Sequence, residues 1–220
     1  MAASEQTLAP AVAGQETAAE KRHARMLIDG AWVDSLSGAL LSVENRAKRC
    51  AIAAVPRGDA ADVNAGVEAA ARAFPAWSKV TPRDRGRLLL RIADTLETRS
   101  EELVRTIALE TGNALRTQAR PEARLAADIF RYFGGLAGEL KGETIPLGEQ
   151  VLSYTRREPI GVVGAIIPWN APVLLAALKI APALCAGNTI VLKAAEDAPL
   201  GVLLMAEICQ GFCLPACSTC

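Results

Sequence analysis

The sequence predicts an α/β fold in which a layer of helices is followed by the first two βα units of a doubly wound parallel sheet. Two observations lead to this prediction: helical periodicity across residues 59–136, and a β-α-β-α alternation across residues 159–212. A third is the segment 139–158, whose Pro and Gly residues between two extended stretches predict a protruding β-hairpin. At 220 residues with 51% hydrophobic content, the chain has enough apolar surface for a sizeable core.

The N-terminal part contains little regular structure. Residues 1–25 are rich in Ala, Glu and Gln without periodicity, which indicates a flexible extension. Two β-leaning runs then follow, "MLIDGAWV" and "AIAAV", separated by Gly and Ser turn residues. We expect them to form one small hairpin.

Four helices are expected between residues 59 and 136. Asp59 is a plausible N-cap of the first, and Thr81 with Pro82 and Asp84 opens the second. The third runs from about Ser100 to Gly112, which can cap its C-terminus, and the fourth covers roughly Pro121 to Leu136. Their apolar stripes are Val63, Val67, Ala71 and Phe74 in the first helix, Leu88, Leu89, Ile92 and Leu96 in the second, and Leu125, Ile129, Tyr132 and Phe133 in the fourth.

The α/β part begins with "IGVVGAIIP", a continuous apolar run typical of a strand that is buried on both faces. A helix follows, with Pro172 at its start and Gly187 after its end; "NTIVLK" is a second buried strand, and a second helix lies between Pro199 and Gly211. A third strand should come next, but only nine residues remain. We therefore expect an incomplete domain.

Polar residues follow both predicted strands, at the sheet edge where ligands of such folds bind. Glu196 can accept hydrogen bonds from two vicinal hydroxyls of a nucleotide ribose, with Lys193 as a neighbouring donor; the alternative is a solvated ion pair. Asn170 can donate an amide N–H to a developing oxyanion; the alternative is a helix N-cap before Pro172. Gly161 does not begin a G-x-G-x-x-G fingerprint, so the residues alone leave dinucleotide binding open.

Composition excludes several functions. Lys plus Arg and Asp plus Glu both number 24, so no basic field exists to attract nucleic acid or an anionic membrane. The N-terminus lacks the apolar core of a signal peptide, and no run of about 18 apolar residues is present, which indicates a cytoplasmic protein. His23 is the only histidine, which argues against a His-dependent triad and a His-rich metal site, and we expect no metal.

The combination of motifs resembles the NAD(P)-dependent aldehyde dehydrogenase superfamily. The segment "REPIGVVGAIIPWNAPVLLAALKIAPALCAGNTIVLKAAEDAPL" resembles its cofactor-binding region, and "LIDGAWV", "FPAWS" and "LETG" precede it in the family's order. The resemblance covers about residues 26–212. It implies an N-terminal helical part of a cofactor-binding domain at 26–138, an oligomerisation hairpin at 139–158 that makes the parent enzyme a homo-oligomer, and a partial Rossmann-like segment at 159–212.

The resemblance also implies roles for individual residues. Asn170 would polarise the aldehyde carbonyl and stabilise the tetrahedral adduct, while Lys193 and Glu196 would bind the adenosine ribose. The residues that would line the cofactor are Ile167, Pro168, Trp169 and Asn170. Glu196 favours NAD over NADP, because a carboxylate disfavours a 2'-phosphate. Two residues depart from the family pattern. Ala194 stands where Pro is usual, and Arg46 stands in "VENRA", where "NPA" is usual.

The implied reaction is NAD(P)-dependent oxidation of a small aldehyde to a carboxylic acid. In that mechanism a cysteine thiolate attacks the aldehyde to give a thiohemiacetal, and a glutamate activates water. Both residues are expected after position 220, so we expect this chain to be inactive alone. Cys185 is expected to be a small buried hydrophobe and not a substitute nucleophile.

The C-terminal "CQGFCLPACSTC" contains four cysteines and allows several interpretations. A zinc site fits poorly, since metal knuckles usually use two close cysteine pairs separated by a longer loop, and Gly211 and Pro215 interrupt the helix. A disulfide needs an oxidising compartment. Deleting one base from a plausible family coding sequence reproduces Phe212 to Cys220 and a stop codon. We therefore interpret residues 213–220 as out-of-frame sequence, while Cys209 belongs to a family helix. Two alternative functions stay open: a non-catalytic fragment that pairs with a full-length homologue, and a metal-binding tail.

Overall fold

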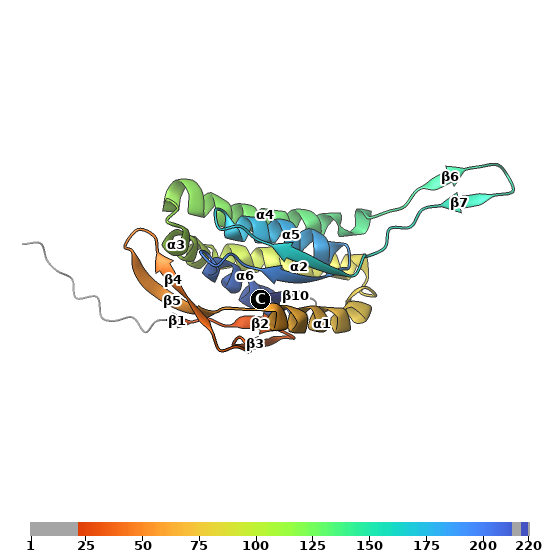
Figure 1. Cartoon of the computed structure of the whole chain (residues 1–220). Coiled ribbons are helices and arrows are strands. Elements are labelled where there is room, and N and C mark those ends of the chain that lie inside the picture. Colours follow the sequence, from red (N-terminus) through yellow and green to blue (C-terminus); the bar gives the residue numbers. More distant parts are fainter. Residues whose placement is uncertain (1–21, 213–216, 220) are drawn as a thin grey trace, which may run out of the picture.

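The computed structural model describes residues 22–212 and 217–219, the side chains of residues 22, 23 and 217–219 excepted (Figure 1). Most of the extension expected over residues 1–25 and of the tail expected over 213–220 therefore lies outside the described residues. The helices of the described part are α1 (Ala60–Trp77), α2 (Pro82–Thr98), α3 (Ser100–Thr111), α4 (Arg120–Leu136), α5 (Pro172–Cys185) and α6 (Leu200–Gln210), with a π-helical turn at Leu115–Ala119 and a 3-10 turn at Ala137–Glu139.

The strands belong to three sheets. They are β1 (Arg22–His23), β2 (Met26–Ile28), β3 (Ala31–Val33), β4 (Leu40–Asn45), β5 (Cys50–Pro56), β6 (Thr144–Pro146), β7 (Leu152–Tyr154), β8 (Val162–Ile166), β9 (Thr189–Lys193) and β10 (Cys217–Thr219). The main sheet has the order β3-β2-β10-β9-β8, a second has the order β1-β5-β4, and β6 pairs with β7 alone.

The main sheet confirms the predicted parallel pair and adds a third parallel strand. β8 pairs with β9 in parallel, and β10 pairs with β9 in parallel on the other side. The sequence analysis did not expect β10. The single N-terminal hairpin was also wrong: "MLIDGAWV" forms the β2–β3 hairpin of the main sheet, whereas "AIAAV" lies in β5 of the second sheet and pairs with β4. Local turn residues do not specify which strands pair over longer distances.

Helices cover both faces of the main sheet. α1 packs against β8, β9 and β10, while α5 and α6 pack against the strands and against the outer helices α2, α3 and α4 (Figure 1). One large hydrophobic core fills the space between these layers. Its largest fully buried side chains are Phe130, Leu89, Ile92, Leu96, Leu103, Ile107, Ile167, Ile180, Leu184, Ile190, Leu192 and Met205. In the described part of the chain no helix has the length and apolarity needed to span a membrane.

The apolar stripe predicted for α1 is wrong. Val63 and Val67 are 40% and 41% exposed, whereas Ala69, Ala70 and Trp77 are buried. The helix lies close to the sheet, so small side chains occupy its inner face. The stripe predicted for α4 is only half right: Ile129 and Phe133 pack against the core, but Leu125 and Tyr132 are exposed. The fully buried face of α4 consists instead of Ala123, Ala126, Ala127, Phe130 and Glu122. The stripe of α2 is confirmed for Leu89, Ile92 and Leu96, which are fully buried.

The predicted helix caps are confirmed. Asp59 accepts hydrogen bonds from the N–H groups of Ala61 and Asp62, and the Asp62 side chain accepts from the Asp59 N–H in return, which completes a capping box. Thr81 caps α2 by accepting from the Asp84 N–H. Gly112 ends α3 with φ of +78°, a conformation that favours glycine.

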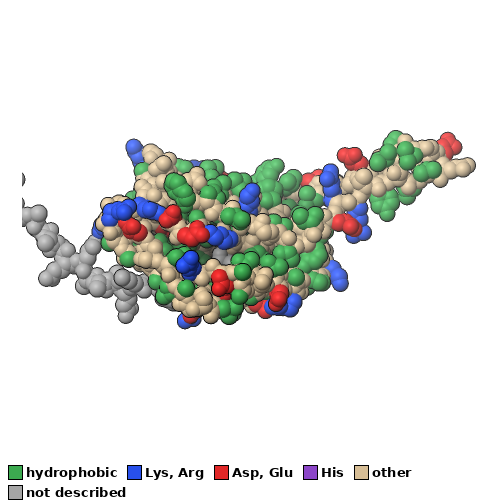
Figure 2. All heavy atoms as spheres, viewed as in Figure 1, with side chains coloured by type: hydrophobic (Ala, Val, Ile, Leu, Met, Phe, Trp, Pro, Cys, Tyr) green, Lys and Arg blue, Asp and Glu red, His purple; other side chains and the backbone are tan. Residues whose placement is uncertain are grey.

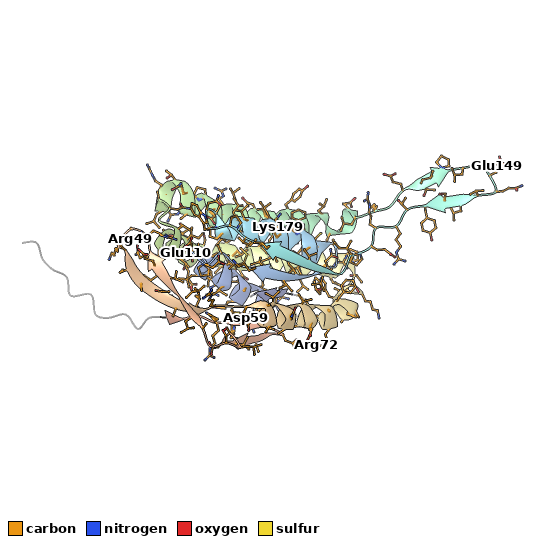
Figure 3. All side chains as sticks on the ribbon, in the orientation of Figure 1. Arg49, Asp59, Arg72, Glu110, Glu149 and Lys179 are labelled. Carbon is orange, nitrogen blue, oxygen red and sulfur yellow. The ribbon has the colours of Figure 1, made fainter. Side chains whose placement is uncertain are left out.

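The predicted hairpin projects well beyond the body of the molecule (Figure 1). Its strands β6 and β7 pair in antiparallel register, Ile145 opposite Ser153, and contact no other sheet. Apolar side chains on it face solvent, including Leu147 at 63%, Leu152 at 80% and Tyr154 at 66% exposure (Figure 2). Glu149 lies at its tip (Figure 3). So much exposed apolar surface on a projecting arm is typical of a protein contact.

Candidate cofactor site at the strand ends

The carboxyl ends of β8 and β9 lie side by side. Ile166 is paired with Lys193 in the parallel register, and the Ile167 N–H donates to the Lys193 carbonyl at 3.0 Å. The loop that carries Asn170 and the loop that carries Glu196 therefore leave the sheet at the same edge, as the sequence predicted. This is the edge at which open α/β sheets bind their ligands.

The loop after β8 places its residues differently. Ile167 is 2% exposed and belongs to the core, whereas Pro168, Trp169 and Asn170 are exposed, Trp169 at 59%. Within the described residues the Asn170 side-chain amide has no hydrogen-bond partner, although its backbone carbonyl accepts from the Asn113 side chain at 3.3 Å. The N-cap of α5 is Ala171 and not Asn170, so the helix-capping interpretation of Asn170 does not hold. Its amide is therefore free to donate to a ligand.

The loop after β9 carries the Lys193–Glu196 pair. The two side chains form a close ion pair and stay 43% and 63% exposed. The hydrogen bond from Lys193 is the main cause that lowers the pKa of Glu196, so Glu196 is ionised near neutral pH. Because exposed ion pairs contribute only about 0–1 kcal/mol, ligand hydroxyls can replace part of this contact at little cost.

A cavity of about 400 Å³ opens beside this pair. That volume lies in the range of about 300–1,000 Å³ that small-molecule sites occupy. It is walled by Lys193, Ala194, Ala195, Glu196 and Pro199 from the strand end, and by Arg25, Met26, Leu41, Val55, Pro56, Arg57, Gly58, Val63 and Leu203. Asn170 and its neighbours in the first loop are not part of this wall. The structure thus brings the two predicted groups to one edge, but it does not enclose them in one cavity.

Arg46 supports the second loop. Its guanidinium forms an ion pair of 2.6 Å with Asp197, the residue after Glu196, and its Cβ lies 3.1 Å from the position that a Cβ at Gly112 would take. The sequence analysis named Arg46 only as a departure from the family pattern. In the structure it links the β4–β5 turn to the loop that carries Glu196, the residue predicted to bind the ribose.

Two buried glutamates from the outer helices hold the crossover helices. Glu122 of α4 accepts from the N–H groups of Val173 and Leu174 at 2.9 and 3.3 Å, at the start of α5. Glu110 of α3 accepts from Leu200 and Gly201 at 2.6 and 2.9 Å, at the start of α6 (Figure 3). Neither helix has a side-chain cap of its own. Each glutamate therefore supplies the missing cap and fixes the end of one strand-end loop.

Burial shifts the acidity of both glutamates. The pKa of Glu110 is raised to about 7, mainly by burial and in small part by the nearby Glu122, against the opposing effect of the two backbone N–H donors. Burial also raises the pKa of Glu122. Glu110 is 0% exposed and Glu122 is 5% exposed. Both thus act as structural carboxylates below the strand-end loops and not as groups open to a substrate.

Two of the three described thiols, those of Cys185 and Cys209, are buried and do not resemble an activated nucleophile, while Cys50 is exposed in β5 of the second sheet. Cys185 is 1% exposed, as predicted, and donates to the Phe133 carbonyl at 3.2 Å; burial raises its pKa. Cys209 is 1% exposed within α6, which confirms its place in a helix. In the part of the chain that is described, no group of three His, Cys, Asp or Glu residues is arranged to hold a metal ion. The metal-binding interpretation of the tail rests on cysteines after position 212, whose side chains lie outside the described residues.

Comparison with known proteins identifies the family. Residues 32–217 match the aldehyde dehydrogenase family model, which is most of the chain. The chain belongs to the aldehyde dehydrogenase family. It is 46% identical over 200 residues to the phenylacetaldehyde dehydrogenase of Pseudomonas fluorescens, and this match covers 87% of the chain but 40% of that protein.

Solved structures of aldehyde dehydrogenases have the same fold. The NAD+ complex of the enzyme from Bacillus cereus matches with a TM-score of 0.87 at 33% identity, over 90% of this chain and 41% of that chain. PnpE of Pseudomonas sp. WBC-3, in its complex with nicotinamide adenine dinucleotide, matches with a TM-score of 0.86 at 40% identity, over 89% and 41% of the two chains. The chain thus spans about 40% of the length of the relatives that it matches.

Three supporting residues of this aldehyde dehydrogenase chain were missed by the sequence analysis. Glu110 was seen only as part of "LETG", and Glu122 was not singled out within the fourth predicted helix. Asn113, which holds the Asn170 backbone, was not considered. A glutamate on the buried face of a helix is a recognisable pattern, because an ionisable residue is seldom buried without a partner. The error in the apolar stripe of α4 concealed this pattern for Glu122.

Proposed function

We propose that this chain provides part of the cofactor domain of an NAD-dependent aldehyde dehydrogenase that oxidises a small aldehyde to its carboxylic acid. The observation that supports this most directly is the meeting of Asn170 and the Lys193–Glu196 pair at one sheet edge. Relatives with the same fold were solved with NAD bound. When bound, the nicotinamide accepts a hydride from the substrate.

The proposed role of Lys193 and Glu196 is to bind the adenosine ribose of NAD. Glu196 is ionised and exposed, so its oxygens can accept from two vicinal hydroxyls, and the Lys193 ammonium can donate beside them. The adjoining cavity of about 400 Å³ suits the adenosine portion. The exposed Pro168 and Trp169 of the neighbouring loop would contact another part of the cofactor, whereas Ile167 is buried in the core beneath them. We propose NAD over NADP because Glu196 would repel a 2'-phosphate.

Asn170 is proposed as the donor to the aldehyde oxygen. Its exposed amide can hold an N–H toward the oxygen as that atom gains negative charge in the tetrahedral adduct. The Asn113 side chain holds the Asn170 backbone, and Glu122 fixes the helix that follows, so the loop is braced on both sides. The parent reaction also needs a cysteine nucleophile and a glutamate base, which we do not find among the described residues. We therefore propose no aldehyde oxidation by this chain alone.

Titration calorimetry of the purified chain tests the cofactor site. We expect binding of NAD, at least tenfold weaker binding by Lys193→Gln and by Glu196→Gln, and weaker binding of NADP. Lys179→Gln is the matched control, because Lys179 is an exposed lysine on α5 outside the strand-end loops (Figure 3). Equal affinity of all variants would refute the ribose assignment, and tighter binding of NADP would reverse the cofactor choice. Turnover of aldehydes with NAD would refute the inactivity.

A second candidate function is association through the hairpin. The exposed Leu147, Leu152 and Tyr154 support a role as an interface with another copy or with a full-length homologue. We propose that Leu152→Lys weakens association measured by light scattering and by co-purification with such a homologue. Leu36→Lys is the control, because Leu36 is 73% exposed but lies outside the hairpin. An equal effect of both changes would refute a specific role of the hairpin.

A further inference from the structure

A second cavity, of about 980 Å³, lies where the hairpin leaves the body. It is distinct from the strand-end site, because neither Lys193 nor Glu196 contributes to it. One wall comes from the end of α1 and the start of α2, and the other from the hairpin stem. The residues of the walls are Phe74, Ser78, Lys79, Val80, Thr81, Pro82, Arg85, Leu140, Gly142, Tyr154, Thr155, Arg156, Arg157, Glu158, Pro159 and Ala186.

The charge of these walls is strongly positive. They hold four cationic side chains, those of Lys79, Arg85, Arg156 and Arg157, and one carboxylate, that of Glu158. Arg156 lies 3.3 Å from Glu158 and is thereby paired. Neither Lys79 nor Arg157 has an ion-pair partner among the residues that the structure describes. Such a local excess of positive charge in a concave site attracts anions, although the whole chain is neutral.

Arg85 is the buried part of this cationic group. It is 6% exposed; its Nε donates to the Cys185 carbonyl at 3.0 Å and its Nη1 to the Val80 carbonyl at 2.5 Å. Its Nη2 has no partner within residues 22–212, and no carboxylate there neutralises its charge. Gly187 leaves room for the guanidinium, since a Cβ at Gly187 would lie 3.1 Å from Nη1. A buried guanidinium without a counter-ion is costly, and a bound anion would offset that cost.

The start of α2 adds to this preference for an anion. Thr81 and Pro82 form part of the wall, and the N-terminus of this helix of 17 residues carries partial positive charge. Asp84 lies in the first turn and would oppose an anion, but it is not itself part of the wall, and its carboxylate is engaged by the Thr81 hydroxyl at 2.7 Å and by Arg87 at 3.1 Å. Phe74, Leu140 and Tyr154 supply an apolar surface in the same cavity.

We infer that this cavity binds a phosphate monoester with an apolar body. The phosphate would lie against the free Nη2 of Arg85 and the side chains of Arg157 and Lys79, because guanidinium and ammonium groups are the preferred donors to phosphate. The apolar body would contact Phe74 and Tyr154. The volume is at the upper end of the range of about 300–1,000 Å³ for small-molecule sites, which leaves room for both parts. This inference does not depend on the proposed cofactor site.

Titration calorimetry of the full chain with phenyl phosphate tests this inference at constant ionic strength. We expect saturable binding, tighter than that of inorganic phosphate, and a loss of about tenfold or more with Arg157→Gln or Lys79→Gln. Glu158→Gln should increase the affinity, since it removes the carboxylate of the wall. Arg105→Gln, which removes an exposed arginine elsewhere, should change nothing.

The absence of saturable binding of phenyl phosphate would overturn the inference, and so would equal effects of Arg157→Gln and Arg105→Gln. Arg85 also supports the fold through its carbonyl contacts, so its variants are not used. Lys193→Gln separates this site from the cofactor site. That change should weaken the binding of NAD and leave the binding of phenyl phosphate unaffected. If it abolished the binding of both ligands, the inference would also be overturned.

Discussion

Glu110 gives the most quantitative prediction of this structure, a fall in stability as pH rises from about 4.5 to about 7. Burial raises its pKa from 4.5 to about 7 in the folded chain, so the folded state holds a proton that the unfolded state has already lost. A carboxyl group of this kind stabilises the fold fully below its unfolded pKa. The contribution is lost as pH rises through the folded pKa.

The magnitude follows from the size of the shift. Each pKa unit corresponds to about 1.4 kcal/mol, so a shift from 4.5 to about 7 amounts to about 3 kcal/mol of unfolding free energy. Glu122 acts in the same direction, because burial raises its pKa as well. Glu196 has a lowered pKa, so its contribution to stability is lost only as pH falls below about 4.5, outside this window. We expect Glu110→Gln to remove most of the decline, since glutamine does not titrate.

Urea unfolding followed by circular dichroism at several pH values between 5 and 8 measures the effect. Glu68→Gln is the matched control, because Glu68 is an exposed glutamate on α1, and its profile should follow that of the unaltered chain. A flat profile of the unaltered chain, or an unchanged decline in Glu110→Gln, would refute the reasoning. The second result would also place the titrating group elsewhere than at the start of α6.

Three further substitutions test the packing around the loops and caps by urea unfolding. Gly201→Ala should lower the free energy of unfolding by about 1–3 kcal/mol, because its Cβ would lie 2.7 Å from Val173 Cγ2 and 3.0 Å from Glu110 Oε1. An unaltered urea midpoint would contradict this. Gly135→Ala should instead stabilise α4 by about 0.5–1 kcal/mol, since its Cβ would meet nothing within 4 Å, and a loss of stability would show an unrecognised contact. Asp59→Ala removes the capping box of α1 and should cost about 1 kcal/mol, whereas no change would mean that the cap is replaced by water.

Sequence patterns predicted the elements of this fold better than their orientation. The helix caps at Asp59, Thr81 and Gly112 were correct because capping depends on a few neighbouring residues. The inward face was wrong for α1 and half wrong for α4, because alanine, glycine and buried acidic residues occupy much of these faces and an apolar stripe gives no indication of that. Which strands pair is likewise decided by long-range packing, as β10 and the two N-terminal hairpins demonstrate.

The candidate site could be predicted only in part. The family and the strand-end location were confirmed, since both depend on contiguous residues between 157 and 200. The individual roles of Asn170, Lys193 and Glu196 stay predictions. Glu110 and Glu122 could not be assigned their roles from the sequence, because each lies at least 50 residues before the backbone N–H groups that it accepts from.

These two carboxylates also restrict how a dinucleotide can bind. In many doubly wound folds the pyrophosphate is held by the free N–H groups of the first crossover helix. Here Glu122 already accepts from those N–H groups in α5, and Glu110 accepts from those of α6. This agrees with the absence of a G-x-G-x-x-G motif after β8. In the proposed site, NAD would therefore be held by side chains at this edge, such as Lys193 and Glu196, with its pyrophosphate away from the starts of α5 and α6.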